Sequence, residues 1–285
     1  AEEIKSLKLG TPELHPFAVE MKGGLRSIMR ANLELGLASA VWVQMAEFNC
    51  SRPSELERKV ARLQFKEWLV PGDAVAVKVK VRRSGMNAKE VEARVLAGIR
   101  RRLSDDGTDP YTSRAAVEIR VRLENDECQI YLDTSGTPLH RRAYRLQTGK
   151  APLREDLACA LLWASGWDRV SPLVDPLMGS GTIPIEAAVL SRRLAPGRLR
   201  SFAFQQSPCF DADVWQKTVD AAAARALPEG ATIFGSDRNA GALEIATKNA
   251  ERAGVQLQLS CAPLSEAPGF DGMRALVTNP PWGGD

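Results

Sequence analysis

The feature that most constrains the fold is a regular alternation of short apolar segments with helical ones, which begins near Pro152. Residues 152–166 have the composition of a helix, and further helices are predicted from Pro184 to about Arg193 and from about Asn239 to Gly254. The strand-like segments are PLVD (172–175), TIFGSD (232–237), VQLQLS (255–260) and ALVTN (275–279). Apolar strands that alternate with helices are typical of a doubly wound parallel sheet. We therefore predict an α/β domain over residues 151–285.

The first half of the chain has a different organisation. In AVAVKVKV (74–81) valine at every second position alternates with alanine or lysine, which predicts a half-buried strand. Helices are predicted from about Ser54 to Leu69 and from Ala88 to about Leu103, the second opened by a capping box of Asn87 and Glu90. Two further strands, VEIRVRL (117–123) and CQIYLD (128–133), complete an α-β-α-β-β order. This order predicts a small α+β module with one face of its sheet buried.

Composition excludes several classes of protein. The chain has 285 residues, which suggests about two domains, and no apolar run approaches the roughly 20 residues that span a bilayer. It begins AEEIKSLKLG, without Met or the features of a signal peptide, so we expect residues to precede Ala1. Five scattered cysteines and two histidines predict neither a metal site, a disulfide framework nor a Ser-His-Asp hydrolase. Reduced thiols of a cytoplasmic protein are expected.

The turn after the first strand of the α/β domain, Asp175-Pro-Leu-Met-Gly-Ser-Gly-Thr182, is a candidate ligand site. Parallel α/β sheets bind ligands at the carboxyl ends of their strands. Gly179 and Gly181 let the backbone approach a ligand where a Cβ would collide. The GxG spacing lacks a third glycine and a following lysine, which argues against a nucleotide di- or triphosphate. A tight turn with a purely structural role is the alternative.

Asp237 ends the second strand of the same domain. A carboxylate at this place can accept hydrogen bonds from both ribose hydroxyls of an adenosine-containing cofactor. It can also cap the helix that begins near Asn239. The two roles are compatible, and both stay open from the sequence.

The most specific segment is Asn279-Pro280-Pro281-Trp282, which follows the fourth strand. Two prolines cannot continue a strand, so they hold the chain in a rigid, extended turn at the strand's carboxyl end. There the amide oxygen of Asn279 and a backbone carbonyl can accept hydrogen bonds from an exocyclic amino group and orient its nitrogen for attack. Trp282 offers a flat face on which a base can stack. No ionisable general base is needed at this position.

These segments resemble a known family. DPLMGSGTIPIEAA, GSDRNAGALEIATKNAERAG and VTNPPWGGD are similar to motifs of the THUMP-containing RNA guanine-N2 methyltransferases, most of all the bacterial enzymes of large-subunit (23S) ribosomal RNA and next the tRNA enzymes. LHRRAYRLQTGKAPLREDLACALL resembles the family's connection into the catalytic domain. Residues 54–133 resemble THUMP, and residues 17–48 resemble the N-terminal ferredoxin-like portion, with a short strand from Phe17 to Met21.

The resemblance implies a Rossmann-like, S-adenosylmethionine-dependent methyltransferase domain at residues 151–285. It implies a ferredoxin-like portion at 1–53 and a THUMP-like RNA-binding domain with its linker at 54–150. The predicted partner is structured RNA, ribosomal or transfer, in the cytoplasm, with no membrane and no metal. The product would carry a methyl group on N2 of a guanine.

The resemblance also assigns site residues. Asp175, Gly179, Gly181 and Thr182 would line the methionine part of the cofactor, and Asp237 would hold its ribose. The cofactor-binding set also includes Pro176, Ser180 and Arg238. The target base would meet Asn279, Pro280, Pro281 and Trp282. A THUMP-like module would bind RNA by shape and phosphate charge. Its candidate residues are Arg82, Arg83, Asn87 and Lys89, and the connecting segment adds Arg141, Arg142 and Arg145.

Three departures from the family keep alternatives open. Ser260-Cys261-Ala262-Pro263 stands where many members carry an acidic residue near the adenine, and Trp282 stands where tyrosine is commoner. The chain stops at Asp285, directly after the fourth strand, so we expect further strands to follow it. The alternatives are N6-methylation of adenine in DNA or RNA, glutamine methylation in a protein, and a non-catalytic RNA-binding or assembly protein.

Overall fold

The computed structural model describes residues 1–103, 117–145, 152–268, 270–271 and 275–280. The chain forms two compact units. Unit 1 comprises Ala1–Ser39, Pro138–Arg200 and Asp213–Asp285, and unit 2 comprises Ala40–Thr137 and Ser201–Ala212. The borders of these two units differ from the domain boundaries that were predicted after residues 53 and 150. The reason is that residues 1–39 and the connecting segment from Pro138 pack with the α/β sheet, whereas residues 201–212 return to unit 2.

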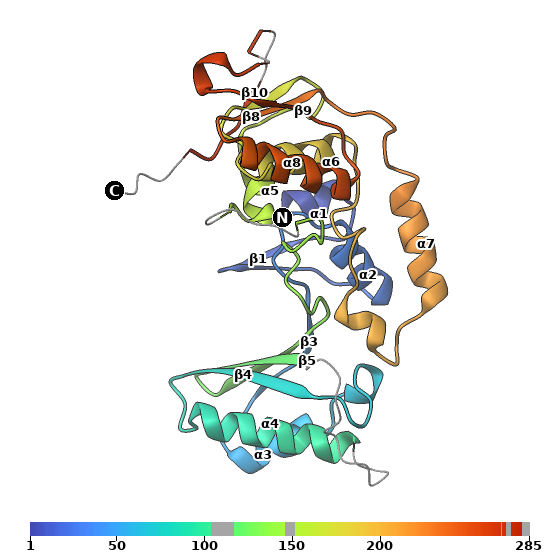
Figure 1. The fold of residues 1–285 in the computed structure, drawn as a ribbon. Coiled ribbons are helices and arrows are strands. Elements are labelled where there is room, and N and C mark those ends of the chain that lie inside the picture. Colours follow the sequence, from blue (N-terminus) through green and yellow to red (C-terminus); the bar gives the residue numbers. More distant parts are fainter. Residues whose placement is uncertain (104–116, 146–151, 269, 272–274, 281–285) are drawn as a thin grey trace. The chain divides into compact units, whose positions relative to one another are not determined.

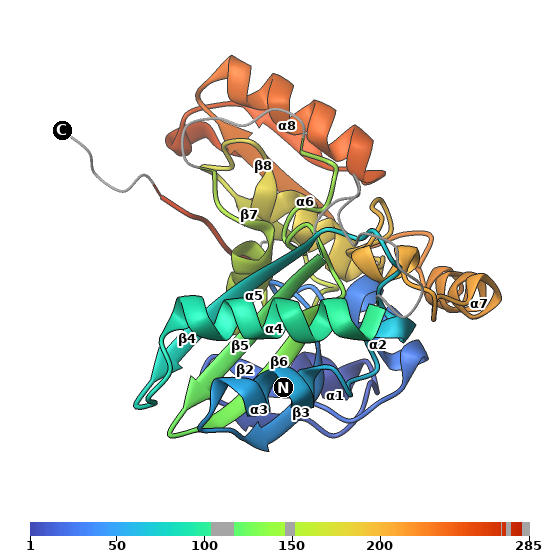
Figure 2. The same ribbon diagram turned by 90° about the horizontal axis from the view of Figure 1, so that it is seen from below.

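Unit 2 is a four-stranded sheet with two helices on one face (Figures 1 and 2). The strand order is β3-β6-β5-β4, in which β4 and β5 run parallel and the other neighbours antiparallel. The elements are β3 (Trp42–Asn49), α3 (Pro53–Val60), β4 (Val75–Arg82), α4 (Ala88–Leu103), β5 (Val117–Glu124) and β6 (Glu127–Asp133). Apolar side chains of both helices and of the inward face of the sheet form one core.

Local sequence signals predicted most of unit 2. The valines of β4 pack against the core while Lys78 and Lys80 are exposed, as the period of two predicted. Helix α4 has the predicted bounds, and Asn87 Oδ1 accepts a hydrogen bond from Glu90 N (3.0 Å) at its start. The helix predicted from about Ser54 to Leu69 begins where expected, but its predicted end is wrong, because α3 ends at Val60. The chain then turns, and a short 3-10 helix (η1, Phe65–Glu67) starts with the fully buried ring of Phe65.

Unit 1 contains a four-stranded parallel sheet of order β10-β7-β8-β9. Helices α5, α6 and α8 lie together on one side of it (Figure 1). The elements are α5 (Glu155–Ala164), β7 (Leu173–Asp175), α6 (Thr182–Ser191), α7 (Ala212–Ala223), β8 (Ile233–Asp237), α8 (Ala240–Ala253), β9 (Gln258–Cys261) and β10 (Ala275–Leu276), with 3-10 turns η2 (Ala203–Gln206, in unit 2) and η3 (Leu264–Glu266). The predicted alternation of strands and helices is therefore confirmed, although α7 was not predicted.

The first 39 residues add α1 (Glu2–Ser6), a hairpin of β1 (Glu13–His15) and β2 (Ala18–Glu20), and α2 (Leu25–Glu34). The strand predicted from Phe17 to Met21 is thus shorter and pairs within a hairpin, whose tip carries Phe17 with a positive φ of 68°. Helix α6 is the central element of unit 1. Nine of its ten residues are buried, including the isolated carboxylate Glu186, so the start of this helix is held rigidly at the sheet.

Candidate active site

The sheet topology of unit 1 creates one position suited to a ligand. In chain order the strands are β7, β8, β9 and β10, but β10 pairs with β7 on the side opposite β8. The winding direction therefore reverses between β7 and β10. In open parallel sheets such a switch point, at the carboxyl ends of the strands, is where ligands bind. The turn after β7, the end of β8 and the segment after β10 all lie at this edge.

The turn between β7 and α6 is built around two glycines in the left-handed region. Gly179 has φ 53° and Gly181 has φ 81°. A Cβ on Gly179 would meet no atom within 4 Å, so open space lies beside this backbone. A Cβ on Gly181 would lie 3.0 Å from Cβ of Ala246 on α8. Gly179 therefore leaves room for a ligand, while Gly181 lets two helices approach each other.

Asp237 braces this turn. Its Oδ2 accepts a hydrogen bond from Gly179 N (3.0 Å), and its Oδ1 accepts one from Asn239 N (2.9 Å). The alternative that Asp237 caps α8 is wrong, because Asn239 is the N-cap and accepts from Gly241 N (2.8 Å). Each carboxylate oxygen keeps a lone-pair site, so Asp237 can still accept hydrogen bonds from a diol. The next residue, Arg238, is exposed.

Asp175 lies beneath the turn. It is 1% exposed and accepts a hydrogen bond from Leu177 N (3.2 Å). Burial raises the pKa of its carboxyl to about 6, against the opposing effects of the Thr278 hydroxyl and the Leu177 N–H; the charge of Asp237 adds to the rise. Asp175 is therefore largely ionised at neutral pH at a free-energy cost. Pro176, also buried, connects it to the turn.

The segment after β10 stays attached to the sheet at the switch point. Val277 N donates to the carbonyl of Val174 (3.1 Å), one residue before Asp175. Asn279, half-buried, and Pro280, exposed, follow at the same edge as the β7 turn. The remaining two predicted residues of this motif, Pro281 and Trp282, lie outside the described residues. Asn279 thus comes to the carboxyl edge at which Asp175 and Asp237 lie.

The remaining cofactor candidates lie at the start of α6 and the end of β9. The Ser180 carbonyl accepts a hydrogen bond from Asn249 Nδ2 (3.1 Å), and Thr182, 4% exposed, is the first residue of the helix. At the end of β9, Ala262 N donates to the Asp237 carbonyl (3.1 Å), and Cys261 is exposed. The residues present fit an adenosine-containing cofactor with an anionic group: open space at Gly179, acceptors on Asp237, and the N–H groups of a helix N-terminus.

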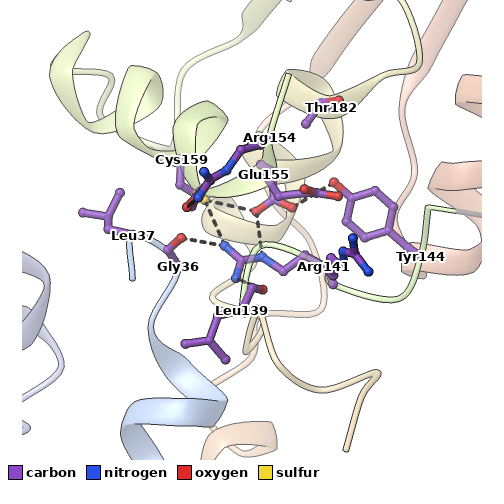
Figure 3. A network of polar contacts seen from close by, with 12 residues as sticks. Gly36, Leu37, Leu139, Arg141, Tyr144, Arg154, Glu155, Cys159 and Thr182 are labelled. Carbon is purple, nitrogen blue, oxygen red and sulfur yellow. Dashed lines mark hydrogen bonds and ion pairs between the residues drawn. The ribbon is translucent and has the colours of Figure 1, made fainter. Parts of the chain in front are cut away.

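Two of the predicted RNA contacts are wrong in this structure. Arg142 is 2% exposed and donates to the carbonyls of Leu139 (2.7 Å) and Gly36 (2.6 Å), within a buried network (Figure 3). The side chain of Arg145 is 9% exposed and donates to Thr182 Oγ1 (2.6 Å). Both guanidiniums compensate carboxylates inside unit 1, so they are not free for phosphate. The candidates that are exposed are Arg82, Arg83, Asn87, Lys89 and Arg141.

Sequence reasoning missed the partners of these arginines. Glu186 Oε2 lies 3.8 Å from Arg142 Nε, and its Oε1 accepts a hydrogen bond from the Tyr144 hydroxyl (2.9 Å). Cys159 Sγ donates to Glu186 Oε2 (3.0 Å), and burial raises the pKa of this thiol well above its usual value. The signal was a lone carboxylate in the apolar helix TIPIEAAVL, which requires a buried partner.

Other possible sites are less suited. A cavity of about 480 Å³ lies at the amino ends of β8 and β9, lined by Thr232, Ile233 and Gln258 among others, at the sheet edge opposite the switch point. Within the described residues, no group of three or more His, Cys, Asp or Glu side chains is placed to hold a metal ion. The described helices also include none with the length and apolar character required to cross a bilayer.

The parallel sheet, its switch point and the GxG turn define a doubly wound α/β fold with a ligand site at the carboxyl ends of its strands. Residues 142–285 match the RMKL-like methyltransferase domain, and the chain belongs to this family. A Synechocystis protein, slr0064, with a provisional name as an RNA methyltransferase, is 31% identical over 97% of this chain and 74% of its own length. The ribosomal RNA large subunit methyltransferase K/L of Psychromonas ingrahamii is 31% identical over 99% of this chain. The chain spans only 39% of that enzyme's length.

Solved structures agree with this assignment. A protein of Listeria monocytogenes, described as a predicted N6-adenine-specific DNA methylase, superposes with a TM-score of 0.88, 31% identity, and coverage of 99% of this chain and 76% of its own. SMU.472, whose description assigns it provisionally as a methyltransferase, was crystallised with S-adenosylhomocysteine. It gives a TM-score of 0.86 at 27% identity, over 98% of this chain and 76% of its own. The predicted methyltransferase fold is confirmed, and so is the predicted cofactor, S-adenosylmethionine, at the level of the family.

Proposed function

We propose that this chain carries the cofactor site and target-base loop of an S-adenosylmethionine-dependent RNA methyltransferase. Its reaction would be methylation of the exocyclic N2 of a guanine, in 23S ribosomal RNA. The observation that carries this proposal is the placement of Asn279-Pro280 at the switch point, on the same sheet edge as the Gly179 turn and Asp237. The family match and the names of the Synechocystis and Psychromonas relatives support the choice of RNA.

Each residue at this edge has a role in the proposed reaction. S-adenosylmethionine supplies a methyl group on a sulfonium. Asp237 would hold the ribose hydroxyls, and the N–H groups at the start of α6 would face the anionic methionine end. The Asn279 amide oxygen would accept a hydrogen bond from the guanine amino group and orient its lone pair. Positive charge would grow on this nitrogen as it takes up the methyl group, and the Asn279 acceptor would stabilise that charge until the proton leaves to solvent.

Unit 2 would hold the RNA as a THUMP-like domain. Arg82 and Arg83 are exposed at the end of β4, and Lys89 is exposed in the first turn of α4. Asn87 uses its Oδ1 to cap α4, so only its Nδ2 is offered to RNA. These groups and the helix N-terminus suit phosphate oxygens. We expect Arg82→Gln/Arg83→Gln to weaken RNA binding and to lower the slope of log K against log salt by about 1.5, because each lost phosphate contact removes about 0.7–0.9.

The experiment uses the full-length protein, radiolabelled S-adenosylmethionine, and RNA and genomic DNA from a strain that lacks the protein. We expect N2-methylguanosine in large-subunit ribosomal RNA. Asn279→Ala should lower kcat by about 10²–10³, or roughly 3–4 kcal/mol, while S-adenosylhomocysteine binding stays within about twofold. Asn49→Ala, an exposed asparagine at the end of β3, is the control and should retain activity. Near-normal turnover of Asn279→Ala would refute the assignment.

Adenine is the second candidate target. The name of the Listeria protein favours it, and an Asn-Pro-Pro-aromatic turn can orient the N6 amino group by the same hydrogen bonds. The same nucleoside analysis separates the candidates. Detection of N6-methyladenine in DNA or RNA would show that the target base is adenine and not guanine. Detection of N2-methylguanosine in tRNA would keep guanine as the target base and change only the RNA substrate. A protein that binds RNA but transfers no label would be a binding or assembly factor.

A further inference from the structure

Arg145 makes an unexpected contact with the cofactor turn. One terminal nitrogen of its guanidinium donates to Thr182 Oγ1 (2.6 Å) and to the carbonyl of Leu153 (2.9 Å). Its Nε lies 3.2 Å from Oε1 of Glu155, which is 5% exposed. Burial raises the pKa of the Glu155 carboxyl, and the charge of Arg145 opposes this rise. The charge of this buried arginine is therefore balanced by the Glu155 carboxylate, and its guanidinium contacts Thr182, the first residue of α6.

This contact determines how the Thr182 hydroxyl can be used. A guanidinium only donates hydrogen bonds, so Thr182 Oγ1 must accept from Arg145, and its own proton is left for another acceptor. Thr182 is the first residue of α6, so it has no preceding helical turn whose carbonyl could accept this proton. Among the hydrogen bonds of the described residues none is donated by Thr182. A hydroxyl that accepts from a cation is also a better donor, because the bonds polarise one another.

The position of this hydroxyl indicates an anionic acceptor. Thr182 follows the left-handed Gly181 at the start of the ten-residue helix α6, where the first N–H groups and the helix dipole favour negative charge. Within the proposed function, the anionic group at this end of the site is the α-carboxylate of the methionine part of the cofactor. We infer that Arg145 is a positioning residue for this carboxylate, which acts through the Thr182 hydroxyl and does not touch the cofactor itself.

A second contact of the same segment explains why the arrangement is rigid. Thr182 and Glu186 are four positions apart in the sequence, so they lie on one face of α6. Arg145 binds the first of these residues, and Tyr144 and Arg142 bind the second. The connecting segment thus holds α6 at two successive turns (Thr182 and Tyr144 are labelled in Figure 3). The hydroxyl is fixed before any ligand arrives, which lowers the cost of binding.

The test compares two ligands by calorimetry on the full-length protein. S-adenosylhomocysteine carries the α-carboxylate, whereas 5′-methylthioadenosine keeps the adenosine and sulfur but lacks the amino-acid end. We expect Arg145→Gln to weaken S-adenosylhomocysteine about tenfold and to leave 5′-methylthioadenosine within about twofold, since one charge-assisted hydrogen bond is lost. Arg193→Gln, an exposed arginine beyond the other end of α6, is the matched control and should change neither affinity.

Substitutions of the threonine test the path of the effect. Thr182→Val removes only the hydroxyl at nearly constant shape, so it should reproduce the ligand-selective loss even where Arg145→Gln folds poorly. Thr182→Ser should bind both ligands as the wild type does. In the double variant Arg145→Gln/Thr182→Val, the losses of S-adenosylhomocysteine affinity should not add. Both substitutions act on the same hydrogen bond from the Thr182 hydroxyl to the carboxylate.

The outcomes separate the inference from the proposed function. Equal losses for both ligands, additive losses in the double variant, or unchanged affinities in a folded Arg145→Gln protein would overturn the positioning role while the proposed function stands. Binding of neither ligand by the wild type would overturn the proposed function and this inference with it. A loss confined to the ligand with the carboxylate in Arg145→Gln and Thr182→Val, together with wild-type binding by Thr182→Ser, supports the role.

Discussion

Replacing Asp175 by asparagine should stabilise the protein at neutral pH. The carboxyl is almost fully buried, and its pKa is raised from 3.8 to about 6. Each pKa unit corresponds to about 1.4 kcal/mol, so the shift of roughly two units makes the ionised carboxylate destabilising by about 3 kcal/mol. Asparagine keeps the shape and an acceptor for Leu177 N but carries no charge. Its advantage is therefore expected to approach about 3 kcal/mol above pH 7.

The pH dependence gives the prediction its sign. Between about pH 4 and pH 6 the folded protein holds a proton that the unfolded chain has lost, so the wild type loses stability as the pH rises through this window. Asp175→Asn does not titrate there, and its advantage should disappear near pH 4. Urea unfolding of both proteins from pH 4 to pH 8 measures the difference. Asp220→Asn, an exposed carboxylate on α7, should show no comparable trend.

A pH-independent difference, or an Asp175→Asn protein less stable than the wild type at pH 8, would refute this reasoning. The same variant should bind S-adenosylhomocysteine more weakly, because the turn above Asp175 is the proposed cofactor site. A residue that costs stability and serves a ligand is expected where function and folding compete. A gain in stability without loss of cofactor affinity would leave the buried charge of Asp175 without a function in binding.

Two further substitutions test the packing of the site. Gly181→Ala should lower the stability of unit 1 by about 1–3 kcal/mol, because it combines a positive φ of 81° with a contact of 3.0 Å to Ala246, and a melting temperature equal to the wild type would contradict this. Arg142→Met should cost about 3–5 kcal/mol in urea unfolding, because it leaves the buried Glu186 without its ion pair. Unchanged unfolding of that variant would refute the view that Arg142 compensates the buried charge of Glu186.

Elements with complete local signals were predictable from the sequence. The alternation in β4 depends only on which side of one strand faces the core, and the start of α4 depends on the cap at Asn87. The end of α3 depends on tertiary packing, since Phe65 and Leu69 become buried only after the chain turns. A continuous helix was compatible with the local sequence, so no pattern in residues 54–69 could have located its end.

The candidate site was predictable as positions but not as contacts. The glycines, Asp237 and Asn279 were placed at strand ends by the β-α order alone, which is a property of any doubly wound sheet. That Asp237 braces Gly179, and that Asn239 caps α8 in its place, depends on the path of the turn in space. Nothing in the spacing of these residues distinguishes a carboxylate that binds ribose from one that also supports the turn.

The misassigned arginines show where charge patterns fail. Arg141, Arg142 and Arg145 form one basic cluster in the sequence, yet only Arg141 is exposed. A cluster of cations indicates a binding surface only when no carboxylate elsewhere in the chain needs a buried partner. Glu186 did, since it stands alone in an apolar helix, and the fold supplied Arg142. Matching each isolated carboxylate of a buried helix with a cation would have removed this arginine from the RNA-binding set, and most of that set would then lie in unit 2.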